Sequence, residues 1–228
     1  MSRRIVTIDG PAGAGKGTVA KIVGKTLGLI QLDSGALYRL ITVHFLKVFN
    51  NELPTNQDHI VVELKNVHVD MQIEEKRIKW ILNGKLVGAE IRDPKVSLAT
   101  SDFSKFIPVR EKVNILLREL SISHDIIIDG RDTGSVVFPH ADLKIYLDAS
   151  PEIRAQRRME QLMQSGKIGN LTYEQILQDT IIRDTNDKSK AFGALKVPEN
   201  ACIIDSSHMT IEDTAQKIID LYHTKVHS

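Results

Sequence analysis

The stretch GPAGAGKGT at residues 10–18 constrains the fold of this chain more than any other feature. It follows the short apolar run RIVTID and precedes apolar residues at helical spacing. A glycine-rich loop in this setting lets backbone N–H groups surround phosphate oxygens, and the helix N-terminus adds partial positive charge. The pattern therefore predicts a loop that binds the phosphates of a nucleotide, made of Gly10, Pro11, Ala12, Gly13, Ala14, Gly15, Lys16, Gly17 and Thr18.

The residues after the last loop glycine depart from the strict pattern G-x-x-x-x-G-K-[ST]. Lys16 is in its expected place, where the amine reaches the β- and γ-phosphates, and we predict that it is catalytic. Gly17 stands where the pattern has a hydroxyl residue, and Thr18 follows one position later. A switch GTPase also needs an N/T-K-x-D motif after a later strand, and the chain has none; the nearest match, TNDK at 185–188, has another order.

Five short β-rich runs predict a parallel sheet. They are RIVTID, LIQLD, DIIID, LKIYLD and ACIID, near residues 6, 31, 127, 145 and 203. Helical patterns fill most gaps, at 16–28, 35–49, 94–106, 109–121, 151–165, 172–190 and 210–224. Alternating strands and helices predict a five-stranded α/β sheet flanked by helices, with ligands at the carboxyl ends of the strands.

Residues 57–93 break this alternation. A polar helical piece, QDHIVVELKNV, leads into three alternating runs, and Asn83-Gly84 is a strong hairpin signal between the last two. We therefore expect a small antiparallel β subdomain at 57–93, inserted into a core of residues 1–56 and 94–228.

Composition excludes several classes of protein. Lys plus Arg is 30 and Asp plus Glu is 29 among 228 residues, so the chain as a whole is not a nucleic-acid binder. No apolar stretch approaches the roughly 20 residues that span a bilayer, and the N-terminus lacks a signal-peptide core. A single cysteine suits a reducing compartment. The eight histidines show no metal-ligand spacing. We expect a cytoplasmic protein without nucleic-acid or membrane partners.

A second pocket is expected where the chain leaves the second and third strands. Ser34 and Arg39 follow the second strand; Arg39 has the fork geometry that suits a phosphate, whereas Asp33 and Ser34 could also serve only as helix caps. Arg131 and Asp132, with Asp129, follow the third strand in IDGRDTG. Two acids beside one arginine suit a nucleotide site, although a solvated charged turn is the alternative.

Two helices carry charged stripes. Arg154, Arg157 and Arg158 are spaced i, i+3, i+4 and therefore share a face. They could clamp the transferring phosphoryl group, whose transition state spreads negative charge, or form a solvated face. Arg183, Asp187 and Lys190 lie on a second stripe; they could grip a sugar hydroxyl and a phosphate, or simply pair with one another.

Several motifs in this order resemble bacterial cytidylate kinases: TIDGPAGAGKGTVAK, LDSGALYR, IDGRDTGSVVFP, KIYLDAS and RRMEQL. The resemblance covers about residues 4–222. It implies a P-loop kinase core with a short lid near 154–170, and it makes 57–93 a substrate-binding subdomain. The implied reaction phosphorylates CMP and dCMP with ATP, assisted by Mg²⁺ that is held largely through water and phosphates.

The resemblance also implies roles for individual residues. Ser34 and Arg39 hold the CMP phosphate; Ser101, Arg110 and Asp132 read cytosine; Arg183 and Asp187 face the ribose and phosphate; Arg131, Arg154 and Arg158 clamp phosphate. The family usually has arginine where this chain has Lys190, and lysine keeps the charge but loses the bidentate fork.

Three alternatives remain open from the sequence. One is a kinase of another nucleoside monophosphate such as UMP, another is a kinase of a non-nucleotide metabolite, and the third is a nucleotide-binding switch without transfer. Nothing in the sequence marks a dimer surface, so we expect a monomer.

Overall fold

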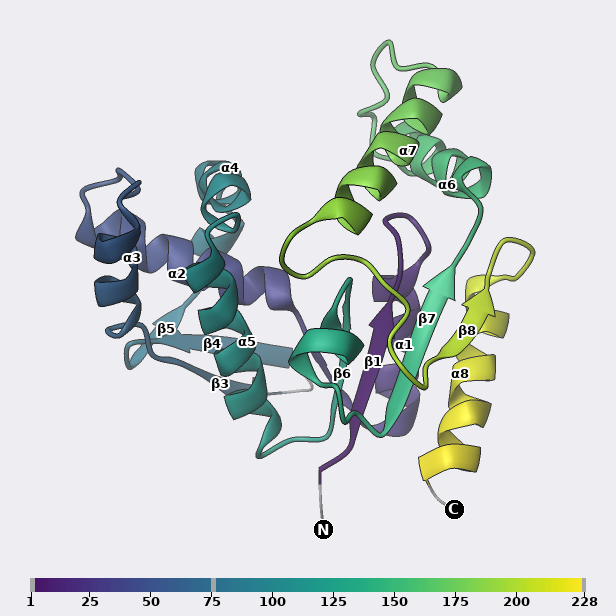
Figure 1. Ribbon diagram of the computed structural model, residues 1–228, viewed down its shortest axis with the longest axis horizontal. Coiled ribbons are helices and arrows are strands. Elements are labelled where there is room, and N and C mark those ends of the chain that lie inside the picture. Colours follow the sequence, from purple (N-terminus) through teal and green to yellow (C-terminus); the bar gives the residue numbers. More distant parts are fainter. Residues whose placement is uncertain (1–2, 75–76, 227–228) are drawn as a thin grey trace. The chain divides into compact units, whose positions relative to one another are not determined.

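The computed structural model describes residues 3–74 and 77–226, which fall into two compact units (Figure 1). The first unit comprises Met1–Leu32 and Asp125–Ser228, and the second comprises Asp33–His124. Each unit has its own β-sheet and its own helices. No helix among the described residues is both long and apolar enough to cross a bilayer.

The sheet of the first unit has five parallel strands in the order β2-β6-β1-β7-β8. The strands are β1 (Ile5–Asp9), β2 (Ile30–Leu32), β6 (Ile126–Gly130), β7 (Leu143–Asp148) and β8 (Cys202–Asp205). Val6 and Ile8 of the central strand are fully buried, as the continuous apolar run predicts for a strand covered on both faces. The predicted five-stranded parallel sheet is confirmed.

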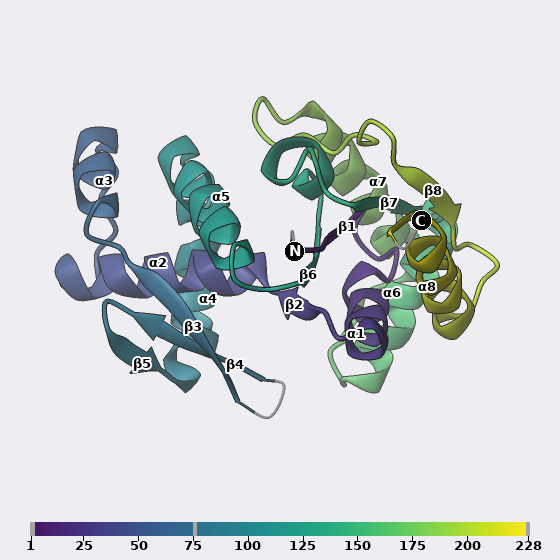
Figure 2. The same ribbon diagram turned by 90° about the horizontal axis from the view of Figure 1, so that it is seen from below.

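Helices α1 (Lys16–Leu27) and α8 (Ile211–Val226) cover one face of this sheet (Figure 2). Val19 and Val23 of α1 pack with Ile218 and Tyr222 of α8 in the core over β1, β6, β7 and β8. Helix α1 ends because Gly28 adopts a left-handed conformation, with φ of 71°, and its N–H bonds to the Gly24 carbonyl. This packing fixes the end of β1 against the start of α1.

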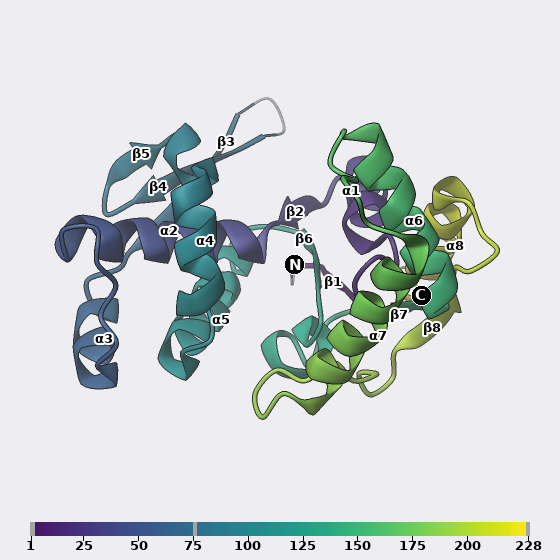
Figure 3. The ribbon, with the colours of Figure 1, turned by 90° about the horizontal axis from the view of Figure 1, so that it is seen from above.

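Helices α6 (Pro151–Gln164) and α7 (Tyr173–Ser189) lie side by side (Figure 3). Ser150 caps α6 by accepting from the Ile153 N–H, and Thr172 forms a reciprocal capping box at the start of α7. Ala155, Leu162 and Ile176 form a small core between the two helices. The predicted helices at 151–165 and 172–190 are thus confirmed, while the lid role of 154–170 stays a prediction.

The second unit combines helices with a three-stranded antiparallel sheet in the order β3-β4-β5. Its elements are α2 (Ser34–Val48), α3 (Gln57–Leu64), β3 (Val69–Glu74), β4 (Arg77–Leu82), β5 (Lys85–Val87), η1 (Ala89–Arg92), α4 (Pro94–Phe103) and α5 (Ile107–Ser121). The rings of Phe45 and Phe103, whose centroids are 4.7 Å apart, join α2 to α4. Trp80 is buried and lies opposite Met71 and Val87 in the sheet.

The predicted hairpin at Asn83-Gly84 is confirmed between β4 and β5. Both residues are left-handed, with φ of 48° and 76°, as a two-residue turn of type I′ requires. The Asn83 side chain accepts from the His68 N–H at 2.8 Å and donates to Nδ1 of His44 at 3.1 Å. Because Nδ1 accepts, Nε2 of His44 carries the proton and donates to Glu63 at 2.6 Å.

The boundaries of the two compact units differ from the boundaries of the predicted subdomain 57–93. Helix α2 contacts α4, α5 and η1, and α5 contacts β3, so helices from both flanks join the inserted strands in one unit of residues 33–124. Local periodicity predicts the elements but not which of them share a core. That residues 57–93 bind substrate stays a prediction.

Asn83→Ala should lower the free energy of unfolding of the second unit by about 1–2 kcal/mol, because it removes two side-chain hydrogen bonds and disfavours the left-handed turn. Urea unfolding followed by fluorescence measures this, since the single tryptophan, Trp80, lies in this unit. Asn66→Ala, at an exposed position, is the control and should change stability by no more than about 0.5 kcal/mol. Equal effects of the two substitutions would contradict the role given to Asn83.

Candidate nucleotide-binding site

The phosphate loop connects β1 to α1, and close backbone approach requires its first glycine. A Cβ on Gly10 would lie 2.0 Å from the Leu147 carbonyl oxygen, a distance that real Cβ atoms essentially never show. Gly13 and Gly15 have φ of 81° and 92°, which side chains disfavour. Gly15 directly precedes α1. The unpaired N–H groups at the start of this helix therefore lie at the loop, where they can bind a phosphate.

Lys16 is buried at the first position of α1. Its Nζ donates to the Pro11 carbonyl across the loop at 2.7 Å. Burial, and then the charge of Arg131, lower the pKa of the amine to about 7, although Asp129, Asp9 and Asp187 act in the opposite direction. An amine this poorly solvated gains strongly from an anionic ligand.

Gly17 leaves room beside a carboxylate. A Cβ at Gly17 would lie 3.7 and 3.8 Å from the two carboxylate oxygens of Asp129 at the end of β6. A carboxylate therefore lies close to the position where the strict loop pattern has a hydroxyl. A carboxylate oxygen beside the phosphate loop suits Mg²⁺, which keeps several waters and needs few protein ligands. No cluster of three or more His, Cys, Asp or Glu side chains capable of holding a metal occurs in residues 3–74 and 77–226.

Asp9, the last residue of β1, holds the segment that follows β6. Its carboxylate accepts from the N–H and hydroxyl of Thr133, at 2.8 and 2.6 Å, and from the N–H of Gly134 at 2.7 Å. These residues open the short π-helical turn η2 (Thr133–Val137), which the sequence did not predict. Burial raises the pKa of Asp9, despite these bonds. Asp9 thereby fixes the turn that begins just after Arg131 and Asp132.

A cavity of about 980 Å³ opens over the loop and is lined by many positively charged side chains. Besides loop residues and Asp129, its walls carry five arginines: Arg131, Arg154, Arg157, Arg158 and Arg183. Together with Lys16 they outnumber the three lining carboxylates, so the cavity attracts a polyanion. The structure thus brings the predicted arginine stripe of α6 to the phosphate loop.

The three arginines of α6 differ in their surroundings. Arg158 is exposed and donates to Gln161 at 2.8 Å. Arg157, predicted only as part of the charged stripe, donates to the carbonyl of Ser206 at 2.7 Å and to its hydroxyl at 3.3 Å. Arg154 is only 3% exposed and donates to protein acceptors through Nε, Nη1 and Nη2. The alternative interpretation, a solvated face, therefore does not describe Arg154.

Asp187 on α7 binds two cations of the predicted site. Its two oxygens accept from Nε of Arg131 at 2.8 Å and from Nζ of Lys190 at 2.6 Å. Burial alone would raise the pKa of Asp187, but the bonds from Lys190 and Arg131 hold it below its usual value. The helix ends at Ser189, so Lys190 is not on the predicted helical stripe, although it still reaches Asp187. Arg183 is exposed and lines the cavity.

The other predicted substrate residues belong to the second unit. Ser34 begins α2, Ser101 is exposed on α4, and Arg110 is half-buried on α5. The predicted cap by Asp33 is wrong: Asp33 occupies the cap position without a side-chain cap bond, because its carboxylate instead accepts from Arg39 at 3.0 Å. Asp132 lies in the first unit, directly before η2.

Comparison with known proteins places this site in a family. Residues 6–224 match the family model described as cytidylate kinase. The cytidylate kinase of Caldicellulosiruptor bescii is 39% identical over 226 residues, covering 99% of this chain and 98% of the relative. That of Thermodesulfovibrio yellowstonii is 42% identical over 221 residues, covering 95% and 96%. Among solved structures, shikimate kinase from Bacteroides thetaiotaomicron aligns with 12% identity, coverage of 96% and 98%, and a TM-score of 0.47.

The parallel sheet, the loop with its lysine and the arginine-rich cavity define a nucleotide-binding phosphotransferase of the P-loop kinase class. Within that class, the chain belongs to the cytidylate kinase family. The resemblance seen in the sequence motifs is therefore confirmed.

Binding of ADP at pH 8 should take up about one proton, because Lys16 is mostly neutral in the free protein and phosphate oxygens favour its charged form. Calorimetric titrations in buffers of different ionisation enthalpy measure this uptake. It should vanish as the pH falls well below 7, where the amine is already charged.

Two variants control this measurement. Lys16→Arg should bind ADP without proton uptake, since a guanidinium stays charged, whereas Lys21→Met, on the exposed side of α1, should retain the uptake. Uptake that persists in Lys16→Arg would assign the proton to another group.

Proposed function

We propose that this protein transfers the γ-phosphoryl group of ATP to CMP and dCMP, giving ADP with CDP or dCDP. The observation that carries the proposal is the family match over residues 6–224, which includes the loop and every arginine of the cavity. ATP is the co-substrate and Mg²⁺ the proposed cofactor. The near-even charge supports a protein that does not bind nucleic acid, and the single cysteine supports a cytoplasmic location. A monomer without a membrane partner is part of the same proposal.

The donor side of the reaction is assigned to the first unit. The loop amides and Lys16 hold the β- and γ-phosphates, and the buried amine meets charge that grows in the transition state. Arg131, Arg158 and Arg183 line the cavity and neutralise the equatorial oxygens of the transferring group. Asp129 beside Gly17 would be the residue suited to hold Mg²⁺, which when bound would offset the negative charge of the phosphates.

The acceptor side of the reaction is assigned to Ser34, Arg39, Arg183, Asp187 and Lys190. Ser34 and Arg39 bind the CMP phosphate, and the ion pair with Asp33 orders Arg39 in advance. Asp187 has accepted one bond on each oxygen, yet a carboxylate offers about four acceptor positions, so it can also accept from a ribose hydroxyl. Arg183 and Lys190 supply positive charge beside it.

Base recognition is assigned to Ser101, Arg110 and Asp132. Cytosine has an acceptor at N3 and a donor at N4, whereas uracil has a donor at N3 and an acceptor at O4. Arg110 can only donate, and an ionised Asp132 can only accept. The pair therefore satisfies cytosine and opposes uracil at both contacts.

A panel of nucleoside monophosphates with ATP in a coupled ADP-release assay tests the function. CMP and dCMP should be the preferred acceptors, with kcat/KM well above that for UMP, because unpaired buried polar groups can discriminate by up to about 10⁴-fold. Preference for UMP or another nucleotide would shift the assignment to that kinase. No stimulation by any acceptor, with ATP still bound, would favour a switch.

Asp132→Asn should narrow the CMP-to-UMP ratio, since an amide can donate to O4 of uracil. The measurement is kcat/KM for both acceptors in both proteins. Asp142→Asn, in the loop before β7, is a control that removes the same charge elsewhere in the chain and should leave the ratio unchanged. A ratio that Asp132→Asn leaves unaltered would remove Asp132 from base recognition.

A further inference from the structure

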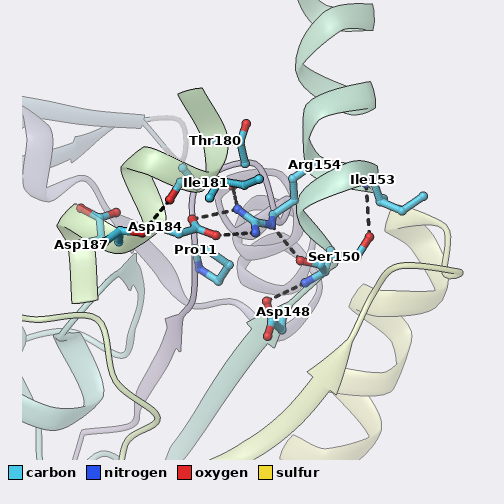
Figure 4. A network of polar contacts seen from close by, with 12 residues as sticks. Pro11, Asp148, Ser150, Ile153, Arg154, Thr180, Ile181, Asp184 and Asp187 are labelled. Carbon is cyan, nitrogen blue, oxygen red and sulfur yellow. Dashed lines mark hydrogen bonds and ion pairs between the residues drawn. The ribbon is translucent and has the colours of Figure 1, made fainter. Parts of the chain in front are cut away.

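The guanidinium of Arg154 is bonded to several protein acceptors (Figure 4). Nε donates to the Ala149 carbonyl at 2.8 Å, and Nη1 donates to the Ala12 carbonyl at 3.2 Å. The two carboxylate oxygens of Asp184 accept from Nη1 at 2.9 Å and from Nη2 at 2.6 Å. Four of the five N–H groups of a guanidinium are thus in use. A side chain with so few remaining donors is poorly suited to clamp a phosphoryl group.

Asp184 is the counter-charge that this arrangement requires. Arg154 lies in the first turn of α6, where the helix dipole disfavours a cation, and it is only 3% exposed. A buried charge is strongly destabilised when its partner is lost. Asp184, whose side chain is 15% exposed, meets it in a bidentate pair from α7. The pair therefore fixes both the direction and the depth of the guanidinium.

The fixed guanidinium supports the phosphate loop from one side. It bonds to the Ala12 carbonyl, and a Cβ on Gly13 would approach Cβ of Arg154 to 3.2 Å. The first turn of α6 and the loop are therefore in tight contact at two consecutive residues. Pro11, next along the loop, carries the carbonyl that accepts from Lys16. A shift of Arg154 would therefore also move the loop backbone that orients the amine of Lys16.

We infer that Asp184 is a positioning residue for phosphoryl transfer. It acts through Arg154, which supports the loop at Ala12 and Gly13 instead of clamping phosphate. This inference rests on the proposed function only for its catalytic consequence. Its structural consequence, an ordered loop in the free protein, is independent of any substrate. Asp187, one helical turn later, holds Arg131 in the same manner, so α7 orders two arginines from different parts of the chain.

The first experiment compares Asp184→Asn with wild type and with Glu174→Gln. Glu174 also lies on α7, is exposed and does not line the cavity, so its substitution removes an equal charge without touching Arg154. In Asp184→Asn, amide hydrogen exchange across residues 10–16 of the nucleotide-free protein should accelerate. The Kd for ADP should rise about tenfold or more, and kcat/KM for ATP should fall by about 10²-fold, since a misplacement near 1 Å has that effect. Asp184→Glu, which keeps the carboxylate, should recover part of each loss.

A double variant separates positioning from stability. Arg154→Met with Asp184→Leu replaces the buried pair with apolar side chains, a change that is often neutral or stabilising. We expect its melting temperature to return to near the wild-type value while loop exchange stays fast and ADP affinity stays low. Recovery of ADP affinity together with stability would show that the pair serves only folding and would overturn the inference. Unchanged loop exchange in both Asp184→Asn and the double variant would overturn it as well.

Failure of the proposed function gives a different result. If wild type bound ADP but transferred phosphate to no nucleoside monophosphate, the reaction would be wrong, whereas the exchange and ADP-binding measurements would still decide the role of Asp184. If wild type transferred phosphate normally and Asp184→Asn matched it in every measurement, only the positioning role would be lost.

Discussion

The close approach of the phosphate loop to the neighbouring strand is the constraint on which the rest of the first unit depends. Gly10 leaves no space for a side chain against the Leu147 carbonyl, so the chain turns where β1 ends. That turn places Lys16 at the start of α1 and leaves Asp9 at the sheet edge, where it holds η2. The carboxyl ends of parallel strands collect these groups at one edge, as expected for α/β sheets.

Ion pairing within the protein then determines which positively charged side chains can still bind a ligand. Asp184 and Asp187 on α7 pair with Arg154 and Arg131, and Asp187 partly offsets the repulsion between Arg131 and the buried Lys16 amine. The exposed side chain of Arg158 in the same cavity lacks such an acidic partner among the described residues. The site therefore combines arginines that are paired with carboxylates and an exposed arginine that is bonded to a neutral side chain.

Much of this arrangement follows from the sequence, because local patterns are strong. The loop, the five strands and the hairpin at Asn83-Gly84 are each specified by a few neighbouring residues. The features that the sequence does not reveal depend on contacts between residues that are not neighbours in the chain. The Arg154–Asp184 pair joins residues 30 positions apart, and the bond from Arg39 that displaces Asp33 from capping competes with a local interaction. The extent of the second unit likewise depends on helix packing that periodicity does not encode.

The most direct measurement is single-turnover phosphoryl transfer by Lys16→Ala with saturating ATP and CMP. The substitution removes one preorganised donor from the growing charge of the transition state, so the rate constant should fall by about 10²-fold or more while circular dichroism shows an unchanged fold. A near-normal rate constant in a folded variant would contradict the assignment of the loop and its buried lysine as the site of transfer.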